Sequence, residues 1–334
     1  MTPSDHTNSQ ATAIAHPNIA LVKYWGKAEL SRNLPAVGSV SITLDELSTT
    51  TRVEVLAPGA DDQFALNGDA EPAMARRSFA FLDQVYGAKR PPLRIDSRND
   101  FPTAAGLASS ASGFAALVTA ANAALRGGFD QHALACQAGS GSGSAARSLY
   151  GGFVRLDKAD DQHADIRVRQ LLPHDAFPLV VLVAITSEAR KTVGSTEAME
   201  QSRKTSPYYP AWLDSHPADM ATAEAAIAQQ DFSALARVSE HSCLKMHAVM
   251  QASSPALIYW NGASLDCMHR IRELRGDGYG VFFTIDAGPQ IKAVCLPSDA
   301  DVVARELACI DGVKRVLRTS LGPGAHLSSQ DSGS

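Results

Sequence analysis

The sequence predicts an α+β protein with two domains, and three observations lead to this prediction. The 334 residues are enough for one large domain or two ordinary ones. The first half alternates strand patterns, rich in β-branched residues, with helical patterns. The second half is more helical and ends in the order helix, strand, strand, helix, strand, which is typical of a small ferredoxin-like sandwich.

The composition is that of a soluble globular protein, with 45% hydrophobic and 19% charged residues. The formal net charge of -5 argues against nucleic acid as the main partner, since nothing indicates a basic face. We therefore expect an anionic substrate to be held by a few placed cations and not by a general positive field. No apolar run is long enough to span a bilayer, so we expect no membrane partner.

The cysteines and the N-terminus indicate a cytoplasmic protein. The five cysteines are scattered, odd in number and include no CxxC pair, so we interpret them as reduced thiols without a disulfide framework or a zinc site. The first ten residues, MTPSDHTNSQ, are polar and lack the apolar core of a signal peptide. We expect residues 1–12 to form a disordered tail.

Strand patterns dominate the chain after this tail. Residues 13–27 mix apolar side chains with two lysines and are broken by Pro17 and Gly26, which predicts a strand that enters a loop. The next elements are expected to be strands at 40–44 and 49–56, a turn-rich connection at 57–72, a helix at 73–86 and a strand at 93–97.

Two lysines and two aromatic residues lie together in the stretch 13–27. Lys23 and Lys27 belong to a residue type that is usually solvated at the surface. Tyr24 and Trp25 belong to types that usually pack in a core or at its rim. The same four side chains could instead grip a phosphorylated ligand, and the spacing alone favours the surface and packing interpretation.

A loop that runs into a helix lies at the centre of the first domain. In PTAAGLASSASG, Pro102 and Gly106 punctuate the loop, and the small apolar residues from Ser112 to the Gly127-Gly128 pair predict a helix. Small side chains around Ser109 and Ser110 would let an anion approach the free N–H groups of the helix N-terminus. The alternative is a buried helix with an N-cap serine, which is the commoner reason for such a serine. The loop lacks the lysine of a P-loop.

A second Gly/Ser run, residues 139–152, follows a short helix expected at 132–138. Such a run could be a flexible linker. However, the run is short, and Arg147 and an apolar pair follow its serines directly. We therefore favour a second ligand loop, in which serine hydroxyls and a planar guanidinium meet a carboxylate or a phosphate.

The second half begins after a buried strand expected at 178–186. The polar stretch 186–195 could be a mobile lid or a crossover, and we place the boundary here, between domains at 13–186 and 187–326, with a disordered tail at 327–334. The later elements are expected to be helices at 217–230, 232–251 with Asp231 as N-cap, 264–275 and 299–310, and strands at 281–286, 291–296 and 313–319.

Four motifs in this order resemble the diphosphomevalonate decarboxylase family of the GHMP kinase superfamily: NIALVKYWGK, PTAAGLASSASG, SGSGSAARSLYGG and FTIDAGP. The resemblance covers residues 13–326. It implies the GHMP-kinase fold, with two α/β domains flanking a deep cleft, a ferredoxin-like C-terminal domain and, usually, a homodimer.

The resemblance also implies the chemistry. The reaction would be ATP-dependent decarboxylation of mevalonate 5-diphosphate to isopentenyl diphosphate, CO₂, ADP and phosphate, in the mevalonate pathway of isoprenoid biosynthesis. ATP and Mg²⁺ are therefore expected. The sequence has no clear acidic metal cluster, so we expect ATP phosphates and hydroxyls to hold Mg²⁺.

Three charged residues match the family's catalytic positions. Asp286, in FTIDAGP, resembles the catalytic aspartate that meets the substrate hydroxyl, although an Asp before Gly-Pro is ordinarily a turn former. Lys23 matches the lysine near that aspartate and the transferred phosphate. Arg147 matches the arginine that contacts the substrate carboxylate.

The resemblance assigns binding residues as well. Tyr24, Lys27, Ser142, Gly143, Ser144 and Ser195 would join Arg147 in binding the substrate, Ser195 from a flexible lid. The nucleotide would be bound by Pro102, Ala105, Gly106, Ala108, Ser109 and Ser110, with Ser110 also near the metal.

Three alternative functions stay open. A decarboxylase of the same fold could act on mevalonate 5-phosphate, which is one phosphate shorter. A small-molecule kinase would stop at the phosphorylated alcohol, and the presence of Arg147 beside Lys23 argues against it. A non-catalytic descendant that only binds a ligand would be favoured by loss of Asp286 or Lys23, and both are present.

Overall fold

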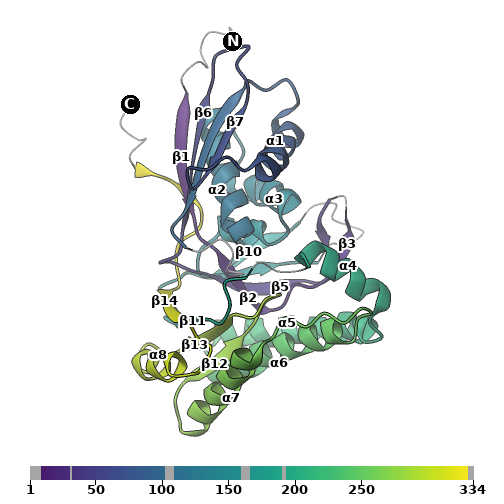
Figure 1. Cartoon of the computed structure of the whole chain (residues 1–334), viewed down its shortest axis with the longest axis vertical. Coiled ribbons are helices and arrows are strands. Elements are labelled where there is room, and N and C mark those ends of the chain that lie inside the picture. The colour runs from purple at the N-terminus through teal and green to yellow at the C-terminus, as the bar shows by residue number, and fades with distance from the viewer. Residues whose placement is uncertain (1–8, 31, 102–108, 159–165, 190–192, 330–334) are drawn as a thin grey trace.

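The structure, a computed structural model, describes residues 9–30, 32–101, 109–158, 166–189 and 193–329. Figure 1 shows an N-terminal part at one end of the molecule and a helical C-terminal part at the other. One mixed sheet and two antiparallel sheets organise the described residues. A short two-stranded pair of β3 (Lys27–Glu29) and β4 (Leu34–Pro35) accompanies them. The mixed α+β class predicted from the sequence is confirmed.

The first sheet has five strands in the order β15-β1-β6-β8-β7. These strands are β1 (Gln10–Ala15), β6 (Thr49–Val55), β7 (Gln63–Leu66), β8 (Leu93–Asn99) and β15 (His326–Leu327). Its pairs are antiparallel except β7 with β8, which is parallel. The strands β6 and β8 fall where their alternating patterns predict them.

Three helices accompany this sheet: α1 (Pro72–Tyr86), α2 (Ser109–Ala124) and α3 (Gln131–Gly141). Helix α2 packs on β1 and β6, and most of its residues are buried. A helix that is apolar all round belongs inside a protein, which fits the run of alanines. The described part of α2 begins at Ser109, which is already before the predicted start at Ser112, and Ser109 and Ser110 line the cavity described below.

The second sheet lies between the two ends of the molecule (Figure 1) and has the order β10-β9-β5-β2. Its strands are β2 (Asn18–Val22), β5 (Ser39–Thr43), β9 (Phe153–Leu156) and β10 (Val168–Leu172). Every residue of β2 and β5 is buried, because α6 and α5 pack against these strands and the 3₁₀ helix Ala145–Leu149 contacts β5. β2 (NIALV) accordingly shows no alternation of apolar and polar residues, whereas β5 (SVSIT) alternates although all its residues are buried.

The third sheet is antiparallel, with the order β12-β13-β11-β14. It consists of β11 (Val180–Ile185), β12 (Val281–Thr284), β13 (Ile291–Cys295) and β14 (Arg315–Ser320). Helices α7 (Gly262–Gly276) and α8 (Ala300–Ala308) contribute to the core on one of its faces. The predicted order helix, strand, strand, helix, strand is confirmed as α7, β12, β13, α8 and β14.

Three further helices complete the C-terminal part: α4 (Ser195–Thr205), α5 (Tyr209–Ala228) and α6 (Phe232–Gln251). Helix α6 begins as predicted, and the Asp231 carboxylate accepts a hydrogen bond from the Ala234 N–H at 2.9 Å. The predicted start of α5 at residue 217 is wrong, because Pro217 lies inside a helix that begins at Tyr209. We had expected the proline at the first turn, where it is best tolerated.

The structure corrects other expectations, mostly at short edge strands. β1 begins at Gln10 and pairs through Ala13 with Leu327, so residues 10–12 and 327 lie in strands and not in tails. β7 lies within the expected turn-rich connection 57–72, and β9 and β10 were not predicted. The expected loop 139–152 is mostly helical, since α3 continues to Gly141 and a 3₁₀ helix covers Ala145–Leu149. Short strands carry too few residues for their periodicity to be recognised.

Candidate active site

A cavity of about 740 Å³ lies where the end of β2, the N-termini of α2 and α4, the end of α3 and the loop after β12 meet. It brings together every predicted site residue that the structure describes: Lys23, Tyr24, Lys27, Ser109, Ser110, Ser142, Gly143, Ser144, Arg147, Ser195 and Asp286. The other predicted nucleotide contacts, Pro102, Ala105, Gly106 and Ala108, lie outside the described residues. Side chains far apart in the sequence thus share one concave site, as expected of a binding or catalytic centre.

At one end of the cavity, two ammonium groups hold the carboxylate of Asp286. Lys23 Nζ lies 2.7 Å from Asp286 Oδ1, and Lys292 Nζ lies 3.3 Å from Asp286 Oδ2. Both lysine side chains are 1% exposed, whereas the side chain of Asp286 is 28% exposed. The carboxylate is therefore the member of the cluster that can meet a ligand. We call Lys23, Asp286 and Lys292 the acid cluster.

The charge state of Asp286 follows from this geometry. Burial by itself would raise the pKa of the Asp286 carboxyl. The ammonium groups of Lys23 and Lys292 outweigh burial and hold that pKa well below its usual range. Asp286 is therefore a carboxylate at neutral pH, and it accepts hydrogen bonds without donating any.

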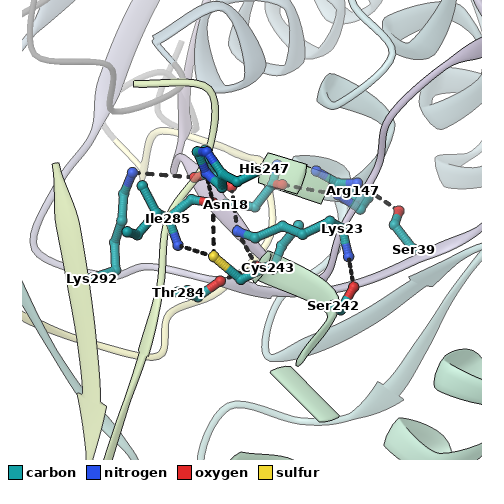
Figure 2. Close-up of polar contacts among 12 residues, drawn as sticks. Asn18, Lys23, Ser39, Arg147, Ser242, Cys243, His247, Thr284, Ile285 and Lys292 are labelled. Atoms are coloured by element: carbon teal, nitrogen blue, oxygen red, sulfur yellow. Dashed lines mark hydrogen bonds and ion pairs between the residues drawn. The ribbon is translucent and has the colours of Figure 1, made fainter. Parts of the chain in front are cut away.

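Side chains of helix α6 form hydrogen bonds with the backbone next to the acid cluster. Cys243 Sγ accepts a hydrogen bond from the Ile285 N–H at 3.2 Å, and His247 Nε2 lies 3.4 Å from the Ile285 carbonyl oxygen. The Lys23 N–H donates to Ser242 Oγ at 2.9 Å. Figure 2 shows these side chains of α6 beside β2 and the end of β12. The helix therefore fixes the backbone on both sides of the Lys23–Asp286 pair.

His247 is neutral in this setting. Burial, together with the positive charge of Lys23, lowers its pKa to about 3. Its ring lies 4.4 Å from the ring of Trp260, centroid to centroid. We assign it a packing role and one hydrogen bond to the backbone that precedes Asp286.

Arg147 forms the other charged end of the cavity and is held by neutral groups. Its Nε donates to Asn18 Oδ1 at 2.9 Å, and its Nη1 donates to Ser39 Oγ at 2.6 Å (Figure 2). Asn18 Nδ2 in turn donates to the Ser144 carbonyl at 3.0 Å and to Ser148 Oγ at 2.7 Å. Among the described residues no hydrogen bond uses Nη2 of Arg147, so this nitrogen is available to a ligand.

The charge of Arg147 lacks a directly bonded anion within the described part of the chain. Burial lowers the pKa of the guanidinium to about 10, and the more distant Asp286 counteracts this effect. The group remains protonated at neutral pH and is only 3% exposed. A buried cation with neutral partners is suited to an anionic ligand, because a carboxylate would supply the missing counter-charge.

Tyr24 connects this end to the second Gly/Ser run. A Cβ added at Gly143 would lie 2.7 Å from the Tyr24 hydroxyl oxygen, so only glycine allows this approach. The hydroxyl is buried and has no hydrogen-bond partner among the described residues. Burial raises the pKa of Tyr24 to about 12, so the phenol keeps its proton. A neutral, unpartnered donor beside the cavity can bind an anionic oxygen.

Lys27 and the start of α4 form the rim. Lys27 Nζ donates to Asn33 Oδ1 at 2.5 Å and to Thr196 Oγ1 at 3.2 Å. Burial lowers the pKa of Lys27, and the positive charge of Arg77 lowers it further. Ser195, the first residue of α4, lines the cavity next to this contact. The rim thus joins the first domain to the helix that follows the polar stretch 186–195.

Ser109 and Ser110 lie half-buried at the N-terminus of α2, on the opposite side of the cavity. The 16-residue helix places free N–H groups and the positive end of its dipole at this point. These donors fit an anionic phosphate chain. No group of three or more His, Cys, Asp or Glu in the described part of the chain could hold a metal ion. A Mg²⁺ ion that accompanies phosphates would therefore take hydroxyl oxygens such as that of Ser110.

The sequence interpretation missed Lys292, Asn18 and Ser39. Lys292 gave a signal, because it is a lysine in the otherwise apolar strand Ile291–Cys295. Asn18 and Ser39 gave none, since their roles depend on contacts with Arg147 across more than a hundred residues of sequence.

The fold places the chain in the class of α+β proteins with the GHMP-kinase fold. A family profile described as the diphosphomevalonate decarboxylase-like N-terminal domain matches residues 15–167. A second profile, the mevalonate 5-diphosphate decarboxylase C-terminal domain, matches residues 181–324. The chain belongs to the diphosphomevalonate decarboxylase family.

Curated relatives and solved structures agree with this family. The diphosphomevalonate decarboxylase mvd1 of Aspergillus fumigatus is 35% identical, over 92% of this chain and 82% of its own. The human diphosphomevalonate decarboxylase is also 35% identical, over 92% of this chain and 81% of its own. The mevalonate diphosphate decarboxylase of Staphylococcus aureus has a TM-score of 0.90 at 34% identity, covering 96% of this chain and 98% of that one. MDDEF in complex with MVAPP, AMPPCP and magnesium has a TM-score of 0.89 at 34% identity, covering 96% and 99%.

Within the described part of the chain, no helix is both long enough and apolar enough to cross a membrane.

Proposed function

We propose that this chain catalyses the ATP-dependent decarboxylation of mevalonate 5-diphosphate to isopentenyl diphosphate, CO₂, ADP and phosphate. One observation carries the proposal: the acid cluster and Arg147 share a cavity with the N-terminus of α2. The family supports it, since a relative of the same fold has been solved with MVAPP and AMPPCP.

The first step is phosphorylation of the tertiary alcohol. Asp286 accepts a hydrogen bond from the substrate hydroxyl and orients its oxygen toward the γ-phosphate of ATP. The new O–P bond forms as the bond from the γ-phosphorus to the β-phosphate oxygen breaks and ADP leaves, and the hydroxyl proton passes by way of Asp286 to solvent. Lys23, 2.7 Å from Asp286 Oδ1, adds positive charge where negative charge develops on the transferred phosphoryl group. Positioning and electrostatics account for most of the catalysis in such a transfer.

The second step converts the phosphorylated alcohol to the alkene. The C–O bond breaks and its electron pair leaves with the phosphate, while the C–C bond to the carboxylate breaks and its electrons form the new double bond as CO₂ departs. Arg147 holds the carboxylate in place through its free nitrogen Nη2. Because the negative charge of the carboxylate disappears in this step, Arg147 contributes by orientation more than by binding the transition state.

The remaining predicted site residues bind the diphosphate of the substrate and the triphosphate of ATP. Tyr24, Lys27, Ser142, Gly143, Ser144 and Ser195 hold the diphosphate of the substrate. Pro102, Ala105, Gly106, Ala108, Ser109 and Ser110 hold the nucleotide. Ser110 contributes a hydroxyl to Mg²⁺, which supplies positive charge to the phosphates when it is bound.

A coupled assay of ADP and CO₂ with both mevalonate phosphates tests the proposal. We expect equal amounts of ADP and CO₂ from mevalonate 5-diphosphate and much slower turnover of mevalonate 5-phosphate. ADP without CO₂ would identify a small-molecule kinase and contradict the proposal. Faster turnover of the monophosphate would assign the chain to the other decarboxylase.

The same family relationship supports proposals for the oligomeric state and the cellular location of the enzyme. We propose a cytoplasmic homodimer whose chains each contain two domains, at residues 13–186 and 187–326. Sedimentation equilibrium of the full chain tests the dimer, and a mass equal to the chain mass of 35.3 kDa would contradict it.

A further inference from the structure

We propose that Lys292 is a positioning residue for this reaction: it holds the carboxylate of Asp286 from the side remote from the substrate. The inference rests on the proposed function and deepens it. Lys292 does not belong to the described residues that line the cavity, whereas Asp286 and Lys23 do. Lys292 therefore acts through Asp286 and does not itself contact the substrate.

The first argument is the place of Lys292 in the third sheet. β13 is an inner strand, and Lys292 pairs with Thr284 on one side and with Val183 on the other. The flanking residues Ile291 and Ala293 face the core beneath α7 and α8. By the alternation of a strand, Lys292 projects from the opposite face, toward β2 and the second sheet.

The second argument is the cost of burying this charge. A lysine that is 1% exposed loses the hydration of its ammonium group, which costs several kcal/mol unless an anion compensates. Among the described residues its only ion pair is with Asp286, 3.3 Å away. An apolar residue would fill this position in an inner strand at less cost, so the ammonium group needs an explanation beyond packing.

The third argument is that the two lysines hold different oxygens of one carboxylate. Lys23 approaches Oδ1 from the end of β2, and Lys292 approaches Oδ2 from β13. Figure 2 shows Lys23 and Lys292 as side chains of two different segments, Lys23 just after β2 and Lys292 on β13. A carboxylate held at both oxygens cannot turn about its terminal torsion, which is otherwise broad. The substrate hydroxyl then meets an acceptor already in its reactive orientation.

Several titratable groups in the described part of the chain interact electrostatically with Asp286. These groups are Lys23, Lys292, Arg147, and the Cys243 and His247 of α6. Lys23 and Lys292 both lower the pKa of Asp286, whereas the His247 ring is neutral and contributes no charge. Removing the ammonium group of Lys292 therefore raises the pKa of Asp286 toward its ordinary value.

The test compares wild type, Lys292→Met, Asp286→Asn and the double variant. Methionine keeps the length of the side chain and removes the charge. We expect Lys292→Met to lower kcat by about 10-fold to 10²-fold, the size of effect expected from a misplaced catalytic group, with the Kd of ATP unchanged. We also expect the acid limb of its kcat profile to move to higher pH, because Asp286 is then protonated more easily. In the Asp286→Asn background the same change should alter kcat by less than about 2-fold, since non-additivity reveals residues that act together.

Lys245→Met is the matched control. Lys245 of α6 pairs with Asp219 of α5 at 2.5 Å in a partly buried ion pair outside the cavity. The control should lower the unfolding temperature but leave the acid limb of kcat in place. A Lys292→Met variant with the wild-type kcat and acid limb would overturn the proposal. An equal loss of kcat in both backgrounds would also overturn it, because Lys292 would then act independently of Asp286.

A substrate-free measurement separates this inference from the proposed function. Asp286→Asn leaves two buried ammonium groups without their carboxylate, so Asp286→Asn/Lys292→Met should unfold at a higher temperature than Asp286→Asn. A double variant that unfolds at the same or a lower temperature would contradict the coupling of Lys292 to Asp286. A wild-type enzyme that released no CO₂ would overturn the proposed function alone, because this unfolding comparison needs no substrate.

Discussion

The two charged ends of the cavity are built in opposite ways. At one end, the single carboxylate of Asp286 is surrounded by two buried ammonium groups. At the other end, the guanidinium of Arg147 has only an amide and a hydroxyl as hydrogen-bond partners among the described residues. The carboxylate of Asp286 thus has its counter-charges within the protein. The described residues supply no carboxylate that is bonded to the guanidinium of Arg147.

This difference indicates which functional group of the substrate binds to each charged group of the cavity. The acid cluster has a fixed acceptor and suits a neutral hydroxyl that must be oriented. Arg147 has an unmatched positive charge and a free nitrogen, and so suits the substrate carboxylate. The hydroxyl and the carboxylate of one small molecule would then be bound by different charged groups of the same cavity, which suits a reaction that changes each of them in a separate step.

The largest effect is expected at the acid cluster. Asp286→Asn keeps the shape of the side chain but removes its negative charge, so the two lysines then repel each other next to a weaker acceptor. We expect kcat to fall by about 10²-fold or more, the size typical of acid–base and electrostatic groups. Steady-state kinetics measure the loss, and the Kd of ATP should remain within a factor of about 2. If Asp286→Asn kept the wild-type kcat, the carboxylate of Asp286 would not be the acceptor that orients the substrate hydroxyl.

A smaller effect, and mainly on substrate binding, is expected at Arg147. Arg147→Gln keeps a donor but removes the charge, which should cost about 2 kcal/mol, the range of hydrogen bonds to charged groups. This corresponds to about a 30-fold loss in kcat/KM. Comparison of the KM for mevalonate 5-diphosphate in both proteins checks it. If KM stayed the same, the carboxylate would have to bind elsewhere.

The smallest effect is expected at the hydroxyl that supports Arg147. Ser39→Ala removes one neutral acceptor of the guanidinium, worth about 1 kcal/mol, or about a 5-fold loss in kcat/KM. Ser41→Ala is the control, because Ser41 lies on the same strand and its hydroxyl has no hydrogen-bond partner among the described residues. Equal kinetics for the two variants would show that Ser39 does not orient Arg147.

The sequence predicted the charged side chains that line the cavity better than the residues that support them. Asp286, Lys23 and Arg147 lie in recognisable motifs, and all three line the same cavity. The partners that define their charge states were not predicted. Lys292 reaches Asp286 through the pairing of β12 with β13, and Asn18 reaches Arg147 across 129 positions. Such contacts depend on the tertiary fold, which local patterns do not encode.

The same distinction applies to the fold. Long periodic elements with local signals were predicted well, such as α6 with its Asp231 cap. The start of α5 was missed because Pro217 lies inside a helix, where packing overrides a local preference. The strands β7, β9 and β15 were missed because each is only two to four residues long and depends on partners elsewhere in the chain.

The most direct measurement is calorimetric binding of mevalonate 5-diphosphate and of its analogue without the carboxylate, each to wild type and to Arg147→Gln. If Arg147 supplies the counter-charge, removing the carboxylate should weaken binding to wild type by about 30-fold, the equivalent of one charged hydrogen bond. The same removal should make almost no difference to Arg147→Gln. An equal loss of affinity in both proteins would contradict the assignment of the carboxylate to Arg147, and with it the division of the cavity into two ends.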